Sequence, residues 1–251
     1  MCQHRNERIA MVLGKWRNGS DAEQHVSAAG SVHGTVWMSS VLDNYDIGMK
    51  QGARAKFYGH DWNPASLQLP VSPDEVLAAS KRHRQGFALL RSEFPEAIAV
   101  WDEKRFKKVQ DIFTAGPFYA VKGQLAETLT HFDLGEGGLI PFTIYKADLE
   151  TPYPGEFFLL NFGCRRETVL PDQSRNVVKF SVHHETGFQK WKVNGWSEDG
   201  DVVVPPAVLE GPDLWFDPAI YNKIFMSDAL AQAVMAIGMG DVFRLQRCAI
   251  A

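Results

Sequence analysis

Residues 223–247 constrain the fold of this chain most, because their pattern predicts three elements in direct succession. A short apolar run predicts a strand and leads into Ser227, whose hydroxyl suits the N-cap of a helix. Apolar residues then recur at helical spacing until Gly238 and Gly240, where a left-handed backbone ends a helix at least cost. Residues 241–247 alternate apolar and polar side chains, which is typical of a strand. The stretch therefore predicts a β-α-β unit.

A second stretch resembles the first when the sequence is shifted by 105 positions. This shift lays residues 121–135 on residues 226–240, and another strand-like run follows. The identical or similar pairs are Leu125 with Leu230, Ala126 with Ala231, Leu129 with Val234, Phe132 with Ile237 and Gly135 with Gly240. Two short amphipathic helices that end in glycine also produce such a match by chance. An internal duplication and a chance similarity both remain open.

Two further segments predict strands. Residues 156–162 follow a proline-rich entry and are too apolar for a strand that faces water, so we expect this strand at the centre of a sheet. Residues 177–182 alternate in part and predict another strand.

The size and the cysteine content indicate a globular protein that needs no covalent support. A chain of 251 residues suits one large domain or two small ones. Cys2, Cys164 and Cys248 are far apart and lack the spacing of a disulfide framework or a zinc knuckle. The N-terminus has no apolar run typical of a signal peptide, and no run is long enough for a membrane span. We therefore expect a cytoplasmic protein without a membrane partner.

The charge is distributed unevenly along the chain. Residues 1–110 contain 15 Lys and Arg against 12 Asp and Glu, whereas residues 111–251 contain 11 against 18. An acidic C-terminal part disfavours nucleic acid as a partner and favours a basic protein. An acidic surface that serves only solubility explains the same composition.

An aromatic and acidic loop is the candidate binding patch within this acidic part. It contains Trp191, Trp196, Glu198, Asp199 and Asp201. Exposed tryptophan beside carboxylates is typical of a protein-binding surface, although tryptophan packed into a core is the alternative. We expect this loop to contact a protein partner.

The chain contains no recognisable catalytic, cofactor or metal motif. A Gly-rich phosphate loop, a GxSxG turn and a CxxC pair are all absent from the sequence. His183 and His184 adjoin Glu185, but neighbouring residues on a strand point to opposite faces, so we expect no metal site there. His60 and Asp61, together with His183 and Glu185, are the candidates for an enzyme whose site is assembled from distant residues.

Three segments resemble immunity protein family eleven of the bacterial polymorphic toxin systems. They are DIFTAGPFYAVKGQLAETLTHFDLGEGGLIPFTIY at 111–145, TPYPGEFFLLNFG at 151–163 and DLWFDPAIYNKIFMSDALAQAVMAIGMGDVFRL at 213–245. The last is the most specific, with an apolar strand that enters Ser-Asp-x-Leu, a helix, Gly-Met-Gly and a final strand. The resemblance covers about residues 111–251.

The resemblance implies an α+β fold with mixed and antiparallel sheets, short helices and β-α-β-like units around 118–145 and 223–247. It places an immunity-family-like domain at 111–251. Residues 1–110 are expected to form an N-terminal α+β region with a poorly ordered start, either joined to that domain or as a subdomain.

The resemblance also implies a role without catalysis. Proteins of this family bind a cognate toxin, often a nuclease or another enzyme delivered by a contact-dependent route such as type VI secretion. The expected partner is a toxin encoded by the adjacent gene, and no cofactor is expected. Neutralisation either by blocking the active site or by locking the toxin's conformation fits this role.

Overall fold

The computed structural model describes residues 34–48, 52–66, 71–184 and 186–251. These residues belong to one compact unit with an α+β fold, as the sequence predicts. Nearly all of the start that was expected to be poorly ordered, residues 1–35, lies outside the described residues.

The described part contains short helices. The α-helices are α1 (Asp74–His83), α2 (Glu103–Phe106), α3 (Gly123–Leu129), α4 (Asp228–Ala236) and α5 (Gly240–Phe243). The 3-10 helices are η1 (Val41–Asp43), η2 (Tyr45–Ile47), η3 (Arg91–Glu93) and η4 (Pro206–Leu209).

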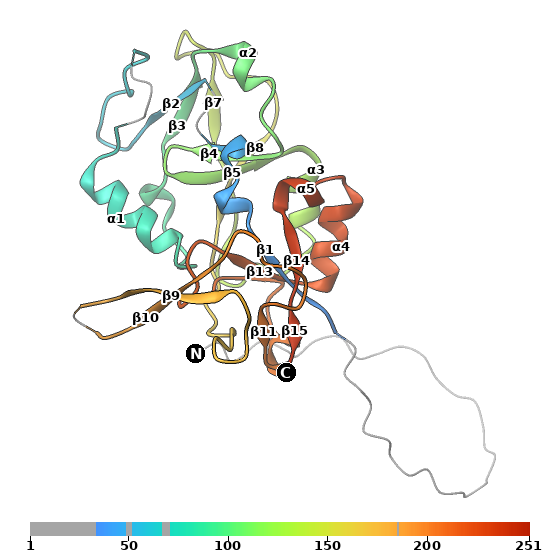
Figure 1. Cartoon of the computed structure of the whole chain (residues 1–251). Coiled ribbons are helices and arrows are strands. Elements are labelled where there is room, and N and C mark those ends of the chain that lie inside the picture. The colour runs from blue at the N-terminus through green and yellow to red at the C-terminus, as the bar shows by residue number, and fades with distance from the viewer. Residues whose placement is uncertain (1–33, 49–51, 67–70, 185) are drawn as a thin grey trace, which may run out of the picture. The chain divides into compact units, whose positions relative to one another are not determined.

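The strands form sheets of two to four members (Figure 1). One four-stranded sheet contains β4 (Ile112–Ala115), β5 (Phe118–Lys122), β8 (Phe157–Asn161) and β6 (Gly138–Pro141), in that order. The other contains β12 (Leu214–Trp215), β13 (Ile224–Ser227), β1 (Val36–Ser39) and β14 (Leu245–Arg247). The smaller sheets are β2 (Ala53–Lys56) with β3 (Ala97–Val100) and β7 (Thr143–Tyr145), β9 (Val177–Val182) with β10 (Gln189–Val193), and β11 (Val203–Val204) with β15 (Ala249–Ile250).

The two four-stranded sheets have the same topology. In the first, β8 pairs antiparallel with both β5 and β6, so these two run parallel on either side of it. In the second, β1 pairs antiparallel with both β13 and β14. Each sheet thus contains a β-α-β unit, β5-α3-β6 or β13-α4-β14, with one strand inserted between its parallel strands. The predicted central position of the apolar strand at 156–162 is confirmed, because β8 is an inserted strand.

Equivalent hydrogen bonds hold the start of the helix in each unit. The N-cap residues are Lys122 for α3 and Ser227 for α4, the pair that the 105-residue shift aligns. The backbone N–H of Lys122 donates to the Asp111 carbonyl at 2.9 Å, and that of Ser227 donates to the Asp213 carbonyl at 2.9 Å. Lys122 Nζ lies 3.1 Å from Asp111 Oδ1, and Ser227 Oγ donates to Asp213 Oδ1 at 2.5 Å. The similarity therefore extends from sequence to geometry.

The end of the second unit differs from the sequence prediction. The chain turns left-handed at Gly238, as expected, but Gly240 begins the extra helical turn α5 instead of ending a helix. The final strand is therefore β14 alone and not all of 241–247. The helical turn buries the Phe243 side chain in the core, and Ser39 Oγ donates a hydrogen bond to the Phe243 carbonyl. These two contacts explain why residues 241–243 form a helical turn and not a strand.

The boundary predicted at residue 110 runs through continuous sheets. Strand β1, from the predicted N-terminal region, lies between β13 and β14 of the predicted C-terminal domain. Strand β3 pairs in parallel with β7 across the same boundary. The described part of 34–110 is therefore joined to 111–251 by backbone hydrogen bonds.

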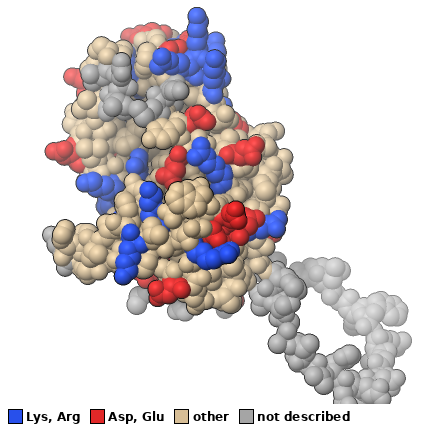
Figure 2. Space-filling view, in the orientation of Figure 1, with Lys and Arg blue, Asp and Glu red and all other residues tan. Residues whose placement is uncertain are grey.

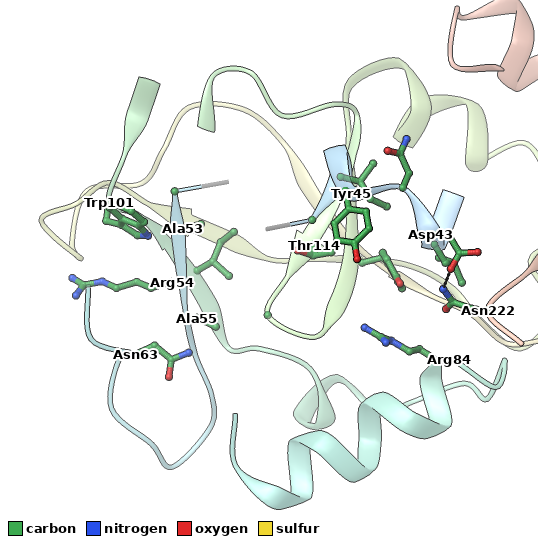
Figure 3. Close-up of a pocket in the computed structure, with 18 of the residues that line it drawn as sticks. Asp43, Tyr45, Ala53, Arg54, Ala55, Asn63, Arg84, Trp101, Thr114 and Asn222 are labelled. Carbon is green, nitrogen blue, oxygen red and sulfur yellow. Dashed lines mark hydrogen bonds between the residues drawn. The ribbon is translucent and has the colours of Figure 1, made fainter. Parts of the chain in front are cut away.

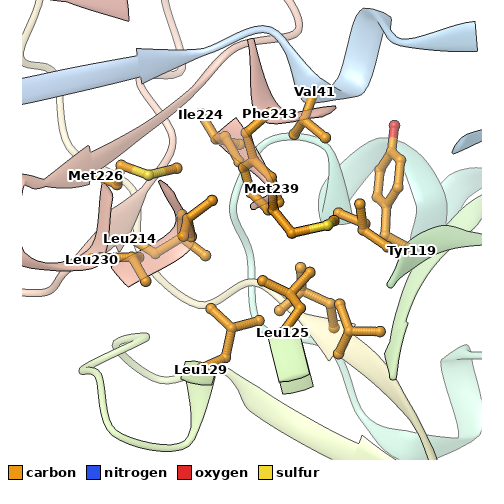
Figure 4. Packing of buried hydrophobic residues seen from close by; sticks show 14 of the residues in the cluster. Val41, Tyr119, Leu125, Leu129, Leu214, Ile224, Met226, Leu230, Met239 and Phe243 are labelled. Carbon is orange, nitrogen blue, oxygen red and sulfur yellow. The ribbon is translucent and has the colours of Figure 1, made fainter. Parts of the chain in front are cut away.

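A central core unites the two four-stranded sheets through the helices α3 and α4. Leu125 and Leu129 of α3, and Leu230 and Val234 of α4, are all buried in this cluster (Figure 4). The strands alternate accordingly: Tyr119 and Val121 of β5 face the central core, as do Ile224 and Met226 of β13. The opposite sheet faces pack on two other clusters, an α1-side core under β2, β3 and α1 and a hairpin-side core beside β9 and β10.

His83, in the last turn of α1, is buried among aromatic rings. Its ring centroid lies 4.7 Å from that of Phe162 and 5.4 Å from those of Phe94 and Phe118. Nε2 lies 2.8 Å from the carbonyl oxygen of Leu160, to which the neutral imidazole donates. Burial lowers the pKa of His83 from its usual 6.5 to about 4, against an opposing contribution from the Leu160 hydrogen bond. His83 therefore connects α1 to β8 in its neutral form.

Truncation of equivalent leucines in the two helices tests the central core. Leu125→Ala and Leu230→Ala should each lower the free energy of unfolding by about 3 kcal/mol, because both side chains are fully buried. Urea denaturation measures this. Glu127→Ala, on the exposed face of α3, is the control and should change the value by less than about 0.5 kcal/mol. A cost below about 1 kcal/mol for either leucine would contradict this packing.

Acid sensitivity tests the burial of His83. The pKa is about 4 in the folded state and higher in the unfolded state, so the unfolded state binds the additional proton and stability falls as the pH decreases from 7 to 4. His83 should account for about 3 kcal/mol of that loss. Between pH 7 and pH 4, the free energy of unfolding of His83→Gln should therefore fall by about 3 kcal/mol less than that of the wild type. The control His131→Gln replaces an exposed histidine and should lose as much stability as the wild type. Parallel profiles for wild type and His83→Gln would refute the assignment.

Candidate protein-binding surface

The hairpin of β9 and β10 stands apart from the larger sheets (Figure 1). The strand predicted at 177–182 is confirmed, because β9 has these bounds. Its turn is closed by the His183 N–H, which donates to the Phe188 carbonyl at 2.9 Å, and by the Gly187 N–H, which donates to the His183 carbonyl at 2.8 Å. Gly187 has a φ of +67°, a conformation that favours glycine. Local turn chemistry therefore fixes the hairpin.

Strand β9 exposes a row of three apolar side chains, the apolar stripe. Val178, Phe180 and Val182 of this strand are 45%, 49% and 53% exposed. The ring of Phe180 lies 4.7 Å from that of Tyr221, which is itself 44% exposed. Val177, Trp191 and Val193 pack instead on the hairpin-side core. The hairpin is thus anchored through one set of side chains and presents the other to solvent.

The outer edge of β9 is open for pairing. Strand β10 is held on its far side, where the Trp191 N–H donates to Ala219 and the Tyr221 N–H donates to Trp191 at 2.7 and 2.8 Å. Within the described part of the chain, β9 pairs with no strand other than β10. The register shifts between Lys190 and Trp191, which lie opposite Ser181 and Lys179, so the extra residue of this β-bulge is Phe180 of β9. An unpaired edge with exposed apolar side chains is a template for strand addition.

The charged side chains of the hairpin strands are basic. They are Lys179, Lys190 and Lys192, and the described residues between 177 and 193 include no Asp or Glu. Figure 2 shows acidic and basic residues interspersed over the viewed face. The acidic total of residues 111–251 is therefore not concentrated at this hairpin.

The predicted tryptophans have different environments. Trp191 lies in β10 and is partly buried against the hairpin-side core, with Lys179 Nζ 6.0 Å from its ring centroid. Trp196, in the loop after the hairpin, is 75% exposed. Trp196 thus fits the predicted contact surface, whereas Trp191 supports the hairpin.

The predicted carboxylates also differ. Asp201 is buried, and its side chain accepts hydrogen bonds from the Glu198 N–H at 2.9 Å and from Asn176 Nδ2 at 2.7 Å. It also pairs with Arg175 at 3.1 Å. These hydrogen bonds, first that from the Glu198 backbone, lower the pKa of Asp201. Asp201 therefore organises the loop internally, whereas Glu198 and Asp199 are exposed.

The structure distributes the candidates for an enzyme site over separate elements. His60 follows β2 and lies 2.9 Å from Glu75 of α1. Asp61 is exposed beside it. His183 is in the turn of the hairpin, 3.2 Å from Thr186 Oγ1, and Glu185 lies outside the described residues. Since β2 and the hairpin are well separated in Figure 1, these residues do not form one site.

The described residues contain neither a metal-binding cluster nor a helix that could span a membrane. No group of at least three His, Cys, Asp and Glu side chains in that part of the chain is arranged to hold a metal ion. No helix there has both the length and the apolar character that crossing a membrane requires. Comparisons with known proteins found no matching family model and no matching curated protein.

Asp201 should act on stability. Asp201→Asn should lower the melting temperature at pH 7, because the carboxylate that accepts these hydrogen bonds is lost. Because the pKa of Asp201 is lowered in the folded state, its carboxylate stabilises the fold at pH values above the ordinary carboxyl pKa. This stabilisation is lost as the pH falls through the folded-state pKa. The difference between wild type and variant should therefore shrink in acid. Glu198→Gln is the exposed control, and an Asp201→Asn melting temperature equal to it would contradict this role.

Proposed function

We propose that this chain is an immunity protein that neutralises a cognate polymorphic toxin by stoichiometric binding. The resemblance of residues 111–251 to immunity protein family eleven suggests this class of protein. The observation that carries the proposal is the apolar stripe on the open edge of β9, formed by Val178, Phe180 and Val182. Exposed apolar strands of this kind are otherwise avoided in monomeric proteins, which favours a protein partner.

The hairpin supplies the features that a binding surface needs. Phe180 and Tyr221 form an aromatic pair at the surface, and aromatic side chains dominate the binding energy of many interfaces. An interface of standard size buries roughly 1,600 Å² in total, more than the stripe alone provides. Trp196, Glu198 and Asp199, exposed in the loop that follows β10, extend the surface. In the proposed complex, the hairpin is the main contact surface for the toxin and this loop is an additional one.

Binding here leads to neutralisation in one of two ways. A toxin segment that pairs with β9 either covers the toxin's active site directly or is held in an inactive conformation. Both act through occupancy, so protection requires immunity protein in at least equal amount to the toxin. We propose that this binding takes place in the cytoplasm of the producing or kin cell.

Co-expression with the toxin domain encoded by the adjacent gene tests the function. Survival of the cells together with co-elution at a fixed ratio is the expected result. Survival without a complex would favour a toxin-modifying enzyme instead. No protection would contradict the proposal and leave the resemblance as one of fold.

Phe180→Asp tests the surface itself. It should weaken the complex at least about 30-fold, the effect of losing a central aromatic contact, and reduce survival. Leu90→Asp is the matched control, because Leu90 is 71% exposed and lies in another part of the chain. Calorimetry of the purified proteins measures both affinities. Equal affinities for the two variants would show that the hairpin does not contact the toxin. The immunity function itself would then be decided by the co-expression experiment alone.

A further inference from the structure

A cavity of about 530 Å³ lies along β2. Its wall includes β2 and the loop to Asn63, the end of α1 at Arg84, and residues of η1 and η2 such as Tyr45 (Figure 3). Thr114 of β4 and Asn222 complete its other side. Cavities of this size hold small organic molecules.

Two buried donors in this wall have no acceptor. Asn63 is only 8% exposed, and its Nδ2 has no hydrogen-bond partner among the described residues. The same holds for Nε of Arg54, which is also buried as an atom. Folded proteins satisfy nearly all buried polar groups, so unpaired donors on a cavity wall indicate an acceptor that the described residues do not supply.

A third donor enters from the opposite side. Figure 3 shows the guanidinium of Arg84 extending from the end of α1 toward Tyr45. The carboxylate among the described lining residues belongs to Asp43, and it is already occupied. Lys223 Nζ lies 2.5 Å from Asp43 Oδ2, and Asn222 donates to Asp43 Oδ1. The wall therefore carries an excess of positive charge and of donors.

We propose that this cavity binds a small organic anion of the carboxylate or phosphate class. Arg84 binds the anionic group, because a guanidinium matches the planar and bidentate geometry of these oxygens. Asn63 Nδ2, an unsatisfied donor on the wall, donates to an acceptor atom at the other end of the ligand, and Arg54 adds positive charge to the same wall. The exposed ring of Tyr45 covers its apolar part near Arg84.

Calorimetric titration of the full chain at low salt tests the proposal with phenyl phosphate and with benzoate. Saturable binding of one or both probes is expected, and the stronger probe identifies the anionic group. Benzyl alcohol, which has the ring without the charge, should bind at least tenfold more weakly. Absence of saturable binding by both anions, or equal binding of the alcohol, would overturn the proposal.

Two variants place the ligand in the cavity. Arg84→Gln should weaken the stronger probe at least tenfold, whereas Lys81→Gln removes the same charge from an exposed position of α1 outside the cavity and should change affinity less than twofold. Asn63→Leu should also weaken binding, with circular dichroism used to verify its fold. Equal affinities for Arg84→Gln and Lys81→Gln would refute the site. The titrations use no protein partner, so their outcome is independent of the immunity function.

Discussion

The contact between α3 and α4 is the interaction on which the rest of the fold depends. The helices contain 7 and 9 residues, fewer than the about 12–15 that an isolated helix needs for marginal stability in water. Each is stable only because one side packs on its own sheet and another side packs on the opposite helix. Leu125 and Leu230 occupy equivalent places in this arrangement. The two halves therefore share a single central core, and neither half buries its helix without the other.

The inserted strands explain how the two halves became interdependent along the chain. The first half takes β8 from the segment shortly after its β-α-β unit, with only β7 between them, whereas the second takes β1 from before the first half. Without β1, both β13 and β14 lose an antiparallel neighbour. The sheet that contains the C-terminal unit thus closes only when residues near the start of the described chain return to it. Loop closure over this separation makes the second sheet the entropically more expensive one to assemble.

Local patterns predicted the elements, and nonlocal pairing determined the rest. The match of Leu125 with Leu230 correctly identified two helices with the same role, and apolar content correctly placed β8 inside a sheet. The insertion of β1 was not predictable, because strand pairing across most of the chain leaves no local signal. Partial alternation in β9 predicted the strand but not that Val178, Phe180 and Val182 would all be exposed, since alternation does not show that most of a strand lies beyond the core. Asp201 looked like a surface acid because its three partners come together only in the folded loop.

An exposed apolar strand edge must be prevented from pairing with copies of itself, and the hairpin has two features that do this. The bulge at Phe180 disturbs the regular ladder of β9 itself, which disfavours a flat and extended self-association. Lys179, Lys190 and Lys192 place positive charge on both strands, so two identical hairpins repel each other. In the proposed complex, the same charges would favour a toxin segment with acidic side chains at β9, even if the toxin as a whole is basic. One set of residues would then both oppose self-association and select the segment that pairs with β9.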